Sequence, residues 1–170
     1  MADDLDVCDM DALSGEFISD EGFERRRYKC PAGKWTIGIG HNLESGPLPP
    51  DIWKLIQSDH PHVTNGLLDD HIELADDIIY RLFAADVLSA IANLDAIWIG
   101  WRALAEHRKR ALINLSFQMG QSRLLGFLRF WRAIKLHDFE TAAAELKDSL
   151  WYIQTQASRT GRVIEQIRNG

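Results

Sequence analysis

The sequence is poor in cysteine, in long apolar runs and in basic residues near its N-terminus. Its two cysteines, Cys8 and Cys30, have no metal-ligand spacing and do not suggest a disulfide scaffold. No apolar run approaches the roughly 18–20 residues that cross a bilayer. The acidic N-terminus also lacks the basic region and apolar run of a signal peptide. We therefore expect no metal, no cofactor, no membrane insertion and no secretion leader.

Positive charge is absent from the first 20 residues. They carry seven of the 25 acids, so the other 150 residues hold 18 acids against 19 bases within the net charge of −6. The acidity is thus mostly an N-terminal arm, expected to be frayed at its first residues. No basic face suits phosphate, which excludes nucleic acid as a partner. The cluster Arg25–Lys29 could steer an acidic substrate locally, but a solvated charge run is the favoured interpretation.

The remaining composition is that of a globular domain. Apolar residues make up 46% and charged residues 26%, and 170 residues can bury a sizeable core. Apolar periodicity predicts helices over 10–21, 51–57, 70–94, 106–118, 123–135, 138–148 and 158–168. Asp138 and Ser158 are suitable N-caps. Together with one short β-hairpin, this predicts a mostly helical α+β fold.

The hairpin is predicted from alternating apolar residues. Trp35, Ile37 and Ile39 share one strand face, and the turn at 31–34 would pair this strand with 28–30. The other face carries Thr36, Gly38 and Gly40, and this lack of bulk leaves room for a ligand. The alternative is a glycine-weakened edge strand beside a surface loop.

Glu21 lies just before this hairpin, in the last turn of the first predicted helix. Gly22 is the natural stop for that helix. The negative end of the helix dipole disfavours an ionised carboxylate there and favours the protonated form, which a general acid requires. The alternative is an ordinary solvated glutamate.

The spacing of these residues resembles the catalytic segment of the T4-type phage lysozymes, glycoside hydrolase family 24. That family has Glu, eight residues, Asp or Cys, five residues and Thr, which Glu21, Cys30 and Thr36 reproduce before the run Ile37–His41. Two further blocks agree, at 110–120 and at 151–155, the latter followed by Arg159, Arg162 and Val163. The similarity covers about 16–170.

The resemblance implies two lobes within one lysozyme-like domain spanning 1–170. Residues 22–70 would form a small β-containing lobe, 71–94 a connecting helix, and 10–21 with 95–170 a helical lobe. The connection over 42–70 is longer than in the best-known member of the family, which suggests a surface insertion at the rim of the cleft.

The resemblance also implies an activity. The protein would be an endolysin, a muramidase that cleaves the β-1,4 bond between N-acetylmuramic acid and N-acetylglucosamine in bacterial peptidoglycan. Glu21 would be the general acid and Thr36 would position water. The implied substrate-binding residues are Tyr28, Gly38, Gly40, Asn42, Asn114, Phe117, Gln118 and Arg159. The implied structural pairs are His41 with Asp86, and Asp20 with Arg162.

Cys30 stands where better-known members carry aspartate, and its role has several interpretations. It could be a base in an inverting reaction, although an unperturbed thiol is mostly protonated at neutral pH. It could instead be a nucleophile in a retaining reaction, or it could help polarise the water that Thr36 holds. A buried packing residue, or a disulfide with Cys8, are less favoured alternatives.

The same resemblance implies where the protein acts and how it reaches its substrate. We expect a monomer that accumulates in the host bacterial cytoplasm and reaches the periplasm and cell wall through a holin or another membrane-permeabilising agent. Three rival functions use similar chemistry: a lytic transglycosylase, a non-catalytic peptidoglycan-binding relative, and a chitin- or chitosan-cleaving hydrolase.

Overall fold

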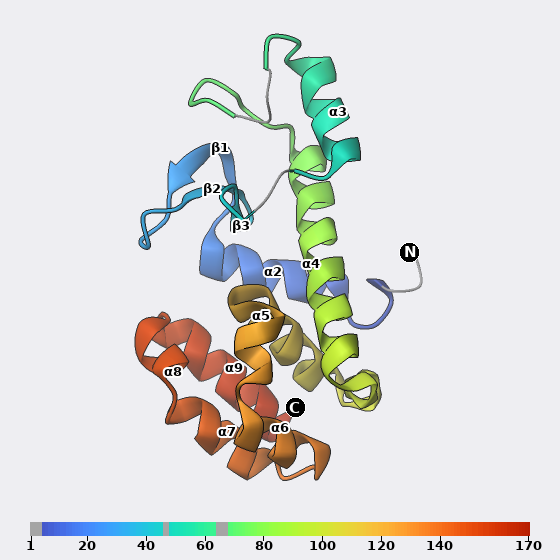
Figure 1. Ribbon diagram of the computed structural model, residues 1–170, viewed down its shortest axis with the longest axis vertical. Coiled ribbons are helices and arrows are strands. Elements are labelled where there is room, and N and C mark those ends of the chain that lie inside the picture. The colour runs from blue at the N-terminus through green and yellow to red at the C-terminus, as the bar shows by residue number, and fades with distance from the viewer. Residues whose placement is uncertain (1–4, 46–47, 64–67) are drawn as a thin grey trace. The chain divides into compact units, whose positions relative to one another are not determined.

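The computed structural model describes residues 5–45, 48–63 and 68–170 (Figure 1). The acidic Asp3 and Asp4 and the expected loop residues Gly46, Pro47 and Gly66 lie outside these ranges. The chain divides into two compact units. One, called here the small unit, is Ser14–Asp86. The other, the large unit, is Met1–Leu13 together with Val87–Gly170. The division expected above, with a separate connecting helix, stays a prediction.

The small unit contains a three-stranded antiparallel sheet with helices around it. Helix α2 spans Met10–Glu21, entering this unit at Ser14, and the strands are β1 (Glu24–Lys29), β2 (Trp35–Gly38) and β3 (His41–Asn42). The strand order is β1-β2-β3. Helix α3 spans Pro50–Asp59, and α4 spans Asp76–Trp98, leaving the unit after Asp86. This confirms the mostly helical α+β class and the hairpin, and adds a third strand that the sequence did not predict.

The core of the small unit joins α2 to the first half of α4. Phe17 and Phe83 are both buried, and their rings meet edge to face with centroids 5.2 Å apart. Ile37 of β2 and Ile79 of α4 have no exposed surface. Buried apolar side chains of α2, β2 and the first half of α4 thus form the interior of this unit.

A ladder of ion pairs fastens the segment before α4 to β1. Its three ion pairs are Arg25 with Asp76 and Arg27 with Asp70, both at 2.7 Å, and Arg26 with Glu73 at 3.0 Å. The amide of Leu74 also donates to the carbonyl of Arg25 at 2.9 Å. The three arginines are therefore paired at the surface, which agrees with the favoured interpretation of this run as solvated charge and gives each arginine a carboxylate partner.

The large unit is helical. It contains the rest of α4, the short 3₁₀ helix η1 (Ile99–Ala103), α5 (Glu106–Leu125), α6 (Leu128–Lys135), α7 (Phe139–Lys147), α8 (Leu150–Gln154) and α9 (Ala157–Asn169). Helix α7 packs against α6, α8 and α9, and α5 packs against α9. Arg108 closes the end of α9 by donating to the carbonyls of Ile167 and Arg168, each at 2.9 Å.

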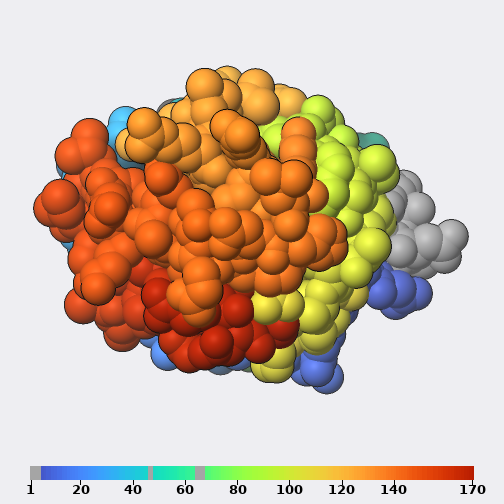
Figure 2. Space-filling view, turned by 90° about the horizontal axis from the view of Figure 1, so that it is seen from below, coloured from blue at the N-terminus to red at the C-terminus, as the bar shows by residue number. Residues whose placement is uncertain are grey.

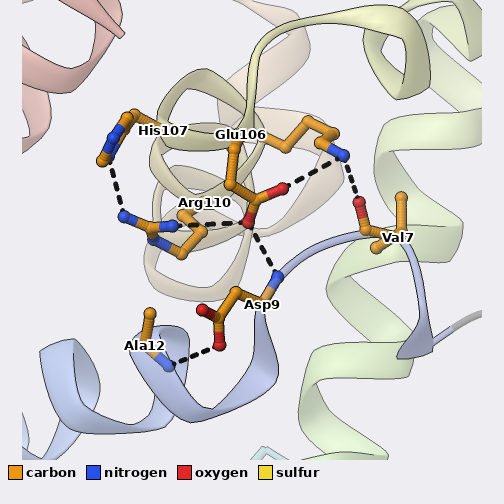
Figure 3. Close-up of polar contacts among 7 residues, drawn as sticks. Val7, Asp9, Ala12, Glu106, His107 and Arg110 are labelled. Carbon is orange, nitrogen blue, oxygen red and sulfur yellow. Dashed lines mark hydrogen bonds and ion pairs between the residues drawn. The ribbon is translucent and has the colours of Figure 1, made fainter.

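The start of the chain is held in the large unit by a charged cluster (Figure 3). The amide of Asp9 donates to Glu106 at 2.7 Å, and Lys109 donates to the carbonyl of Val7. Arg110 also donates to Glu106, at 3.3 Å. The Asp9 carboxylate accepts from the amide of Ala12 at 2.9 Å and so caps α2. The second half of the acidic arm is therefore ordered by specific contacts.

Several helix ends differ from the sequence-based expectation. Helix α3 begins at Pro50, because proline suits the first helical position, where no amide partner is needed. Helix α4 begins at Asp76, six residues later than expected, because the preceding residues lie along β1. Asp138 caps α7 as expected, by accepting from the amide of Thr141. Ser158 is no cap, since α9 begins one residue earlier.

Two predictions about apolar residues need correction. The apolar periodicity that predicts a helix over 123–135 would place Leu128 on its buried side, but this side chain is 74% exposed. The stretch Asp76–Ala103 is, among the described residues, the one long and apolar enough by length and composition to cross a membrane, with a mean hydropathy of 1.6. A core helix passes the same test. In this stretch Leu82, Val87 and Leu94 are buried, and 33% of the apolar window is buried in all.

Candidate active site

The end of α2 places Glu21 on the turn between β2 and β3. The amide of Gly22 donates to the carbonyl of Ile18 at 2.9 Å, and the positive φ of 81° at Gly22 turns the chain toward β1. A Cβ added to Gly40 would lie 2.9 Å from Cγ and 3.0 Å from Cδ of Glu21. The Glu21 side chain therefore rests directly on the backbone of Gly40.

Thr36 occupies the centre of the small sheet. Its cross-strand partners are Tyr28 on β1 and Asn42 on β3, and it is only 4% exposed. The hydroxyl lies 3.2 Å from the carbonyl of Lys34. The same hydroxyl also bonds the thiol of Cys30. The hydroxyl has one proton to donate. It donates to the carbonyl of Lys34 while the thiol is neutral, and to the sulfur when the thiol is ionised.

Cys30 lies at the end of the hairpin turn, where its ionised form is stabilised. Its amide donates to the carbonyl of Lys34 at 3.0 Å, and its own carbonyl accepts from Gly33 at 2.8 Å, which closes the turn. Burial alone would raise the pKa of the thiol. Hydrogen bonds from the backbone of Lys34 and Ala32 and from the Thr36 hydroxyl outweigh burial, so the pKa of Cys30 is lowered. Such a thiol is more readily ionised than an ordinary cysteine.

Tyr28 connects this turn to Glu21. Its hydroxyl donates to the backbone carbonyl of Glu21 at 3.3 Å. Burial raises the pKa of Tyr28, and the negative charges of Glu21 and Cys30 raise it further. The charge of Glu21 also opposes ionisation of Cys30. Glu21, Tyr28, Cys30 and Thr36 thus lie within electrostatic reach of one another in one corner of the small unit.

The two glycines of the predicted small-residue face are explained by packing within the protein rather than by room for a ligand. The space next to Gly40 is filled by Glu21, and a Cβ on Gly38 would lie 3.2 Å from Cγ2 of Ile79. Both residues also have positive φ, at 65° for Gly38 and 75° for Gly40. Close packing of protein atoms, rather than empty space for a sugar, explains them. Their contact with substrate stays a prediction.

Two other residues of the small unit shape the same loop. Asn42 accepts from the amide of Glu44 at 2.9 Å and so fixes the turn after β3. Nδ1 of His41 lies 2.8 Å from Oδ2 of Asp86 on α4. The structure thus contains the contact that was expected between these two residues, and it ties β3 to the long helix. Both roles orient the backbone beside Glu21.

The other predicted site residues lie in the large unit. Gln118 of α5 donates to Asn114, and Nε1 of Trp151 on α8 donates to Oε1 of Gln118 at 3.1 Å. Trp151 opens the 151–155 block noted in the sequence, and its indole orients the Gln118 amide. Phe117 is half-buried on the same helix.

Arg159 and Arg162 lie on α9 of the large unit, and Arg159 is buried. The expected contact of Arg159 with Glu21, and that of Arg162 with Asp20, would each join the two units. Both contacts stay predictions. In the described part of the chain, no group of three or more His, Cys, Asp or Glu side chains suits a metal ion.

The two cysteines should react very differently with alkylating agents. Burial, reinforced by Glu106, raises the pKa of Cys8 to about 11, whereas the pKa of Cys30 is lowered. Because pH 8 lies about three units below that pKa, only about one Cys8 in a thousand would be a thiolate at pH 8. We expect iodoacetamide to modify Cys30 first, as peptide mass spectrometry would show.

A Thr36→Val variant is the matched control for the alkylation experiment. It removes the hydroxyl that stabilises the thiolate, so the pH midpoint of Cys30 alkylation should rise while Cys8 stays protected. Equal rates at both cysteines of the folded protein would contradict the assigned environments.

Comparison with known proteins agrees with this geometry. The model of the phage lysozyme family matches residues 19–164. Two probable T4-type lysozymes of Dictyostelium discoideum are 30% and 32% identical, each over 89% of this chain and 90% of its own length. The pre-baseplate central spike protein Gp5 of Enterobacteria phage T4 is 30% identical over 89% of this chain, which spans 26% of that protein.

These matches cover most of the chain, including Glu21, Cys30 and Thr36. The family implies peptidoglycan as substrate and hydrolysis of a glycosidic bond as the reaction. The chain therefore belongs to the phage lysozyme family and is a glycoside hydrolase, a lysozyme of the muramidase type.

Proposed function

We propose that the protein is an endolysin in which Glu21 is the general acid, Thr36 positions the attacking water, and Cys30 is the base or the nucleophile. The observation that supports this assignment is the corner of the small unit in which the Glu21 charge acts on Cys30, and Cys30 bonds Thr36. Its substrate would be the β-1,4 bond between N-acetylmuramic acid and N-acetylglucosamine. The buried Arg159 would hold the substrate and the acid in the assembled site.

The reaction begins with proton transfer from Glu21 to the oxygen that leaves the anomeric carbon. As that bond breaks, the sugar acquires oxocarbenium character and is attacked from its opposite face. If water attacks, Cys30 takes the water proton and the anomeric configuration inverts. If the thiolate attacks, a glycosyl–sulfur bond forms, water later displaces the sulfur, and the configuration is retained.

The environment of Cys30 bears on both routes. Its lowered pKa increases the thiolate present at neutral pH, which either role requires. The hydrogen bonds that stabilise the thiolate also weaken it as a base and as a nucleophile, because they must be loosened as the sulfur shares its charge. The anomeric form of the first product, observed by NMR before mutarotation, distinguishes inversion from retention.

A Cys30→Asp variant tests whether the thiol acts as a base. A carboxylate can take a proton from water at this position, so this variant should keep activity and should give the inverted product. Cys30→Ser removes the ionisable group and should lower turnover by about a hundredfold or more, the usual contribution of an acid–base group. Full activity of Cys30→Ser would exclude a chemical role for the sulfur.

Hydrolysis is favoured over the lytic transglycosylase reaction by the residues that face Glu21. A transglycosylase closes an anhydro ring and needs no attacking water, whereas Thr36 and Cys30 together form a polar site suited to water. Mass spectrometry of the fragments tests this directly, because hydrolysis adds one water molecule that an anhydro product lacks. Anhydro-sugar ends throughout the digest would overturn the proposal.

The same proposal includes the route to the substrate. The protein would act as a monomer that reaches the wall from the host cytoplasm after a holin or a similar agent opens the membrane. Turbidity should then fall when the protein is added to permeabilised Gram-negative cells and should stay constant with intact cells. Clearing of both at equal rates would contradict the need for a permeabilising agent.

A further inference from the structure

An exposed apolar surface in the large unit has no part in the proposed catalysis. It is formed by the end of α5, helix α6 and the end of α4, and it is called here the α6 face. Leu128 is 74% exposed, Leu136 is 69% exposed and Leu125 is 50% exposed. Burying leucine rather than exposing it is worth about 1.5–3 kcal/mol per side chain, so three exposed leucines on one short helical segment require an explanation.

The α6 face contains a groove of about 500 Å³. Figure 2 shows α6, in orange, beside the yellow-green end of α4 on this side of the molecule. The residues that line the groove are Ile97, Leu125, Leu128, Trp131, Arg132, Lys135 and Leu136. Its floor is apolar and two cations stand among its lining residues.

The charge around this face is unlike that of the whole chain. Between Gly120 and His137 there are four Lys or Arg residues and no Asp or Glu, in a protein of net charge −6. Arg132 and Lys135 form no ion pair within the described ranges 5–45, 48–63 and 68–170. Arg129 approaches Glu145 only at 3.8 Å.

The nearest carboxylate on the end of α4 is already neutralised. Asp95 accepts from Arg102 at 2.7 Å and from Nε1 of Trp101 at 2.9 Å. On the neighbouring α7 segment, Asp138 accepts from the amide of Thr141 and Glu145 lies 3.8 Å from Arg129. This leaves Arg132 and Lys135 as the cations of this face without a carboxylate partner among the described residues.

We propose that the α6 face binds the surface of an anionic phospholipid bilayer. Exposed leucines and cations occur together along α6 and at its two ends, as Leu125, Leu128 and Leu136 with Arg129, Arg132 and Lys135. This is the arrangement in which apolar side chains enter the boundary between headgroups and acyl chains while cations meet the lipid phosphates. Binding is peripheral, and it does not depend on the roles proposed for Glu21 or Cys30.

An acidic protein segment is the other occupant that the charge would accept. A bilayer fits better, because the outermost side chains are very exposed and a flat surface can reach them: Leu128 is 74% exposed, Leu136 is 69% exposed, and the side chain of Arg129, outside the groove, is 85% exposed. A lysozyme held on the membrane would also stay close to the wall that borders it. The acidic segment and a second copy of the chain are therefore outcomes that the test must distinguish.

The test is co-sedimentation of the full chain with vesicles of phosphatidylglycerol and phosphatidylethanolamine, compared with vesicles of phosphatidylcholine alone. We expect binding to the anionic vesicles only, and loss of that binding at high ionic strength because salt screens the phosphates. No binding to the anionic vesicles at low salt overturns the proposal.

Two pairs of matched variants assign the binding to this face. Arg132→Gln with Lys135→Gln should lower the partition coefficient more than tenfold, since each cation near a lipid surface contributes about fivefold. Lys54→Glu changes the net charge equally on an exposed side of α3 and should have little effect. Equal loss in both proteins would indicate a general charge effect and would contradict a specific face.

The apolar half of the face has its own control. Leu128→Ser with Leu136→Ser should weaken vesicle binding, whereas Leu150→Ser with Ile153→Ser should not, although α8 exposes these side chains by 70% and 76%. All four positions are exposed, so the variants should fold, as thermal unfolding would verify. Unchanged binding of the first variant overturns the proposal, as does a concentration-dependent dimer that this variant abolishes in the absence of lipid.

Discussion

Replacement of Glu21 by glutamine is expected to lower turnover on peptidoglycan by about a hundredfold to ten-thousandfold, the usual contribution of a general acid. The amide has no proton to give to the leaving oxygen. It has nearly the same shape as the carboxyl group, so it should pack on Gly40 as Glu21 does and leave the folded structure intact. Clearing of permeabilised cells gives the rate, and thermal unfolding tests the fold.

Glu24→Gln is the matched control for the loss of Glu21. It removes the same charge three residues later, from an exposed position on β1. We expect its activity to stay within a factor of about three of the unaltered protein, since exposed substitutions have small effects. A Glu21→Gln protein that is folded and fully active would rule out Glu21 as the proton donor.

Replacement of Gly40 by alanine is expected to damage both stability and activity. The new methyl group would lie 2.9 Å from Cγ of Glu21, and the residue would keep a φ of 75° that alanine adopts poorly. Backbone strain of about 1–2 kcal/mol and overpacking of about 1–3 kcal/mol together predict a loss of about 2–5 kcal/mol. Denaturant unfolding measures this loss, and turnover should fall as well because Glu21 must move.

Gly33→Ala separates the two causes. Gly33 has almost the same φ, 76°, but no atom lies within 4 Å of the position where its Cβ would stand. Its alanine variant should lose only the strain, about 1–2 kcal/mol. The difference between the two variants is then the contact with Glu21. Equal losses would mean that Gly40 is required only for its backbone conformation.

Much of the fold could be predicted from local chemistry. Helix α2 has the predicted bounds because its apolar spacing, its acidic cap and the glycine after it all agree. The start of α4 could not be predicted in this way. Ile72 and Leu74 continue an apolar pattern into the helix, but the ion pairs with β1 hold this segment extended. Pairing with residues more than forty positions away is invisible to periodicity.

The candidate site was predicted from the spacing of residues rather than from periodicity. The spacing of Glu21, Cys30 and Thr36 predicted the candidate residues, while periodicity alone would have predicted only a hairpin after a helix. Why position 40 is glycine could be explained only from the structure, because the structure shows which side chain fills the space beside it. Trp151 was overlooked as a partner of Gln118, since tryptophan in a helical segment is usually a packing residue.

The ladder between β1 and residues 70–76 also bears on how copies of this protein meet. A strand at the side of a sheet offers unpaired amides and carbonyls to any other extended chain, which is a common origin of aggregation. Here Leu74 already bonds the carbonyl of Arg25, and three acidic side chains lie along the strand. The sheet is thereby shielded on this side, because a segment of the same chain covers the strand that another molecule would otherwise meet.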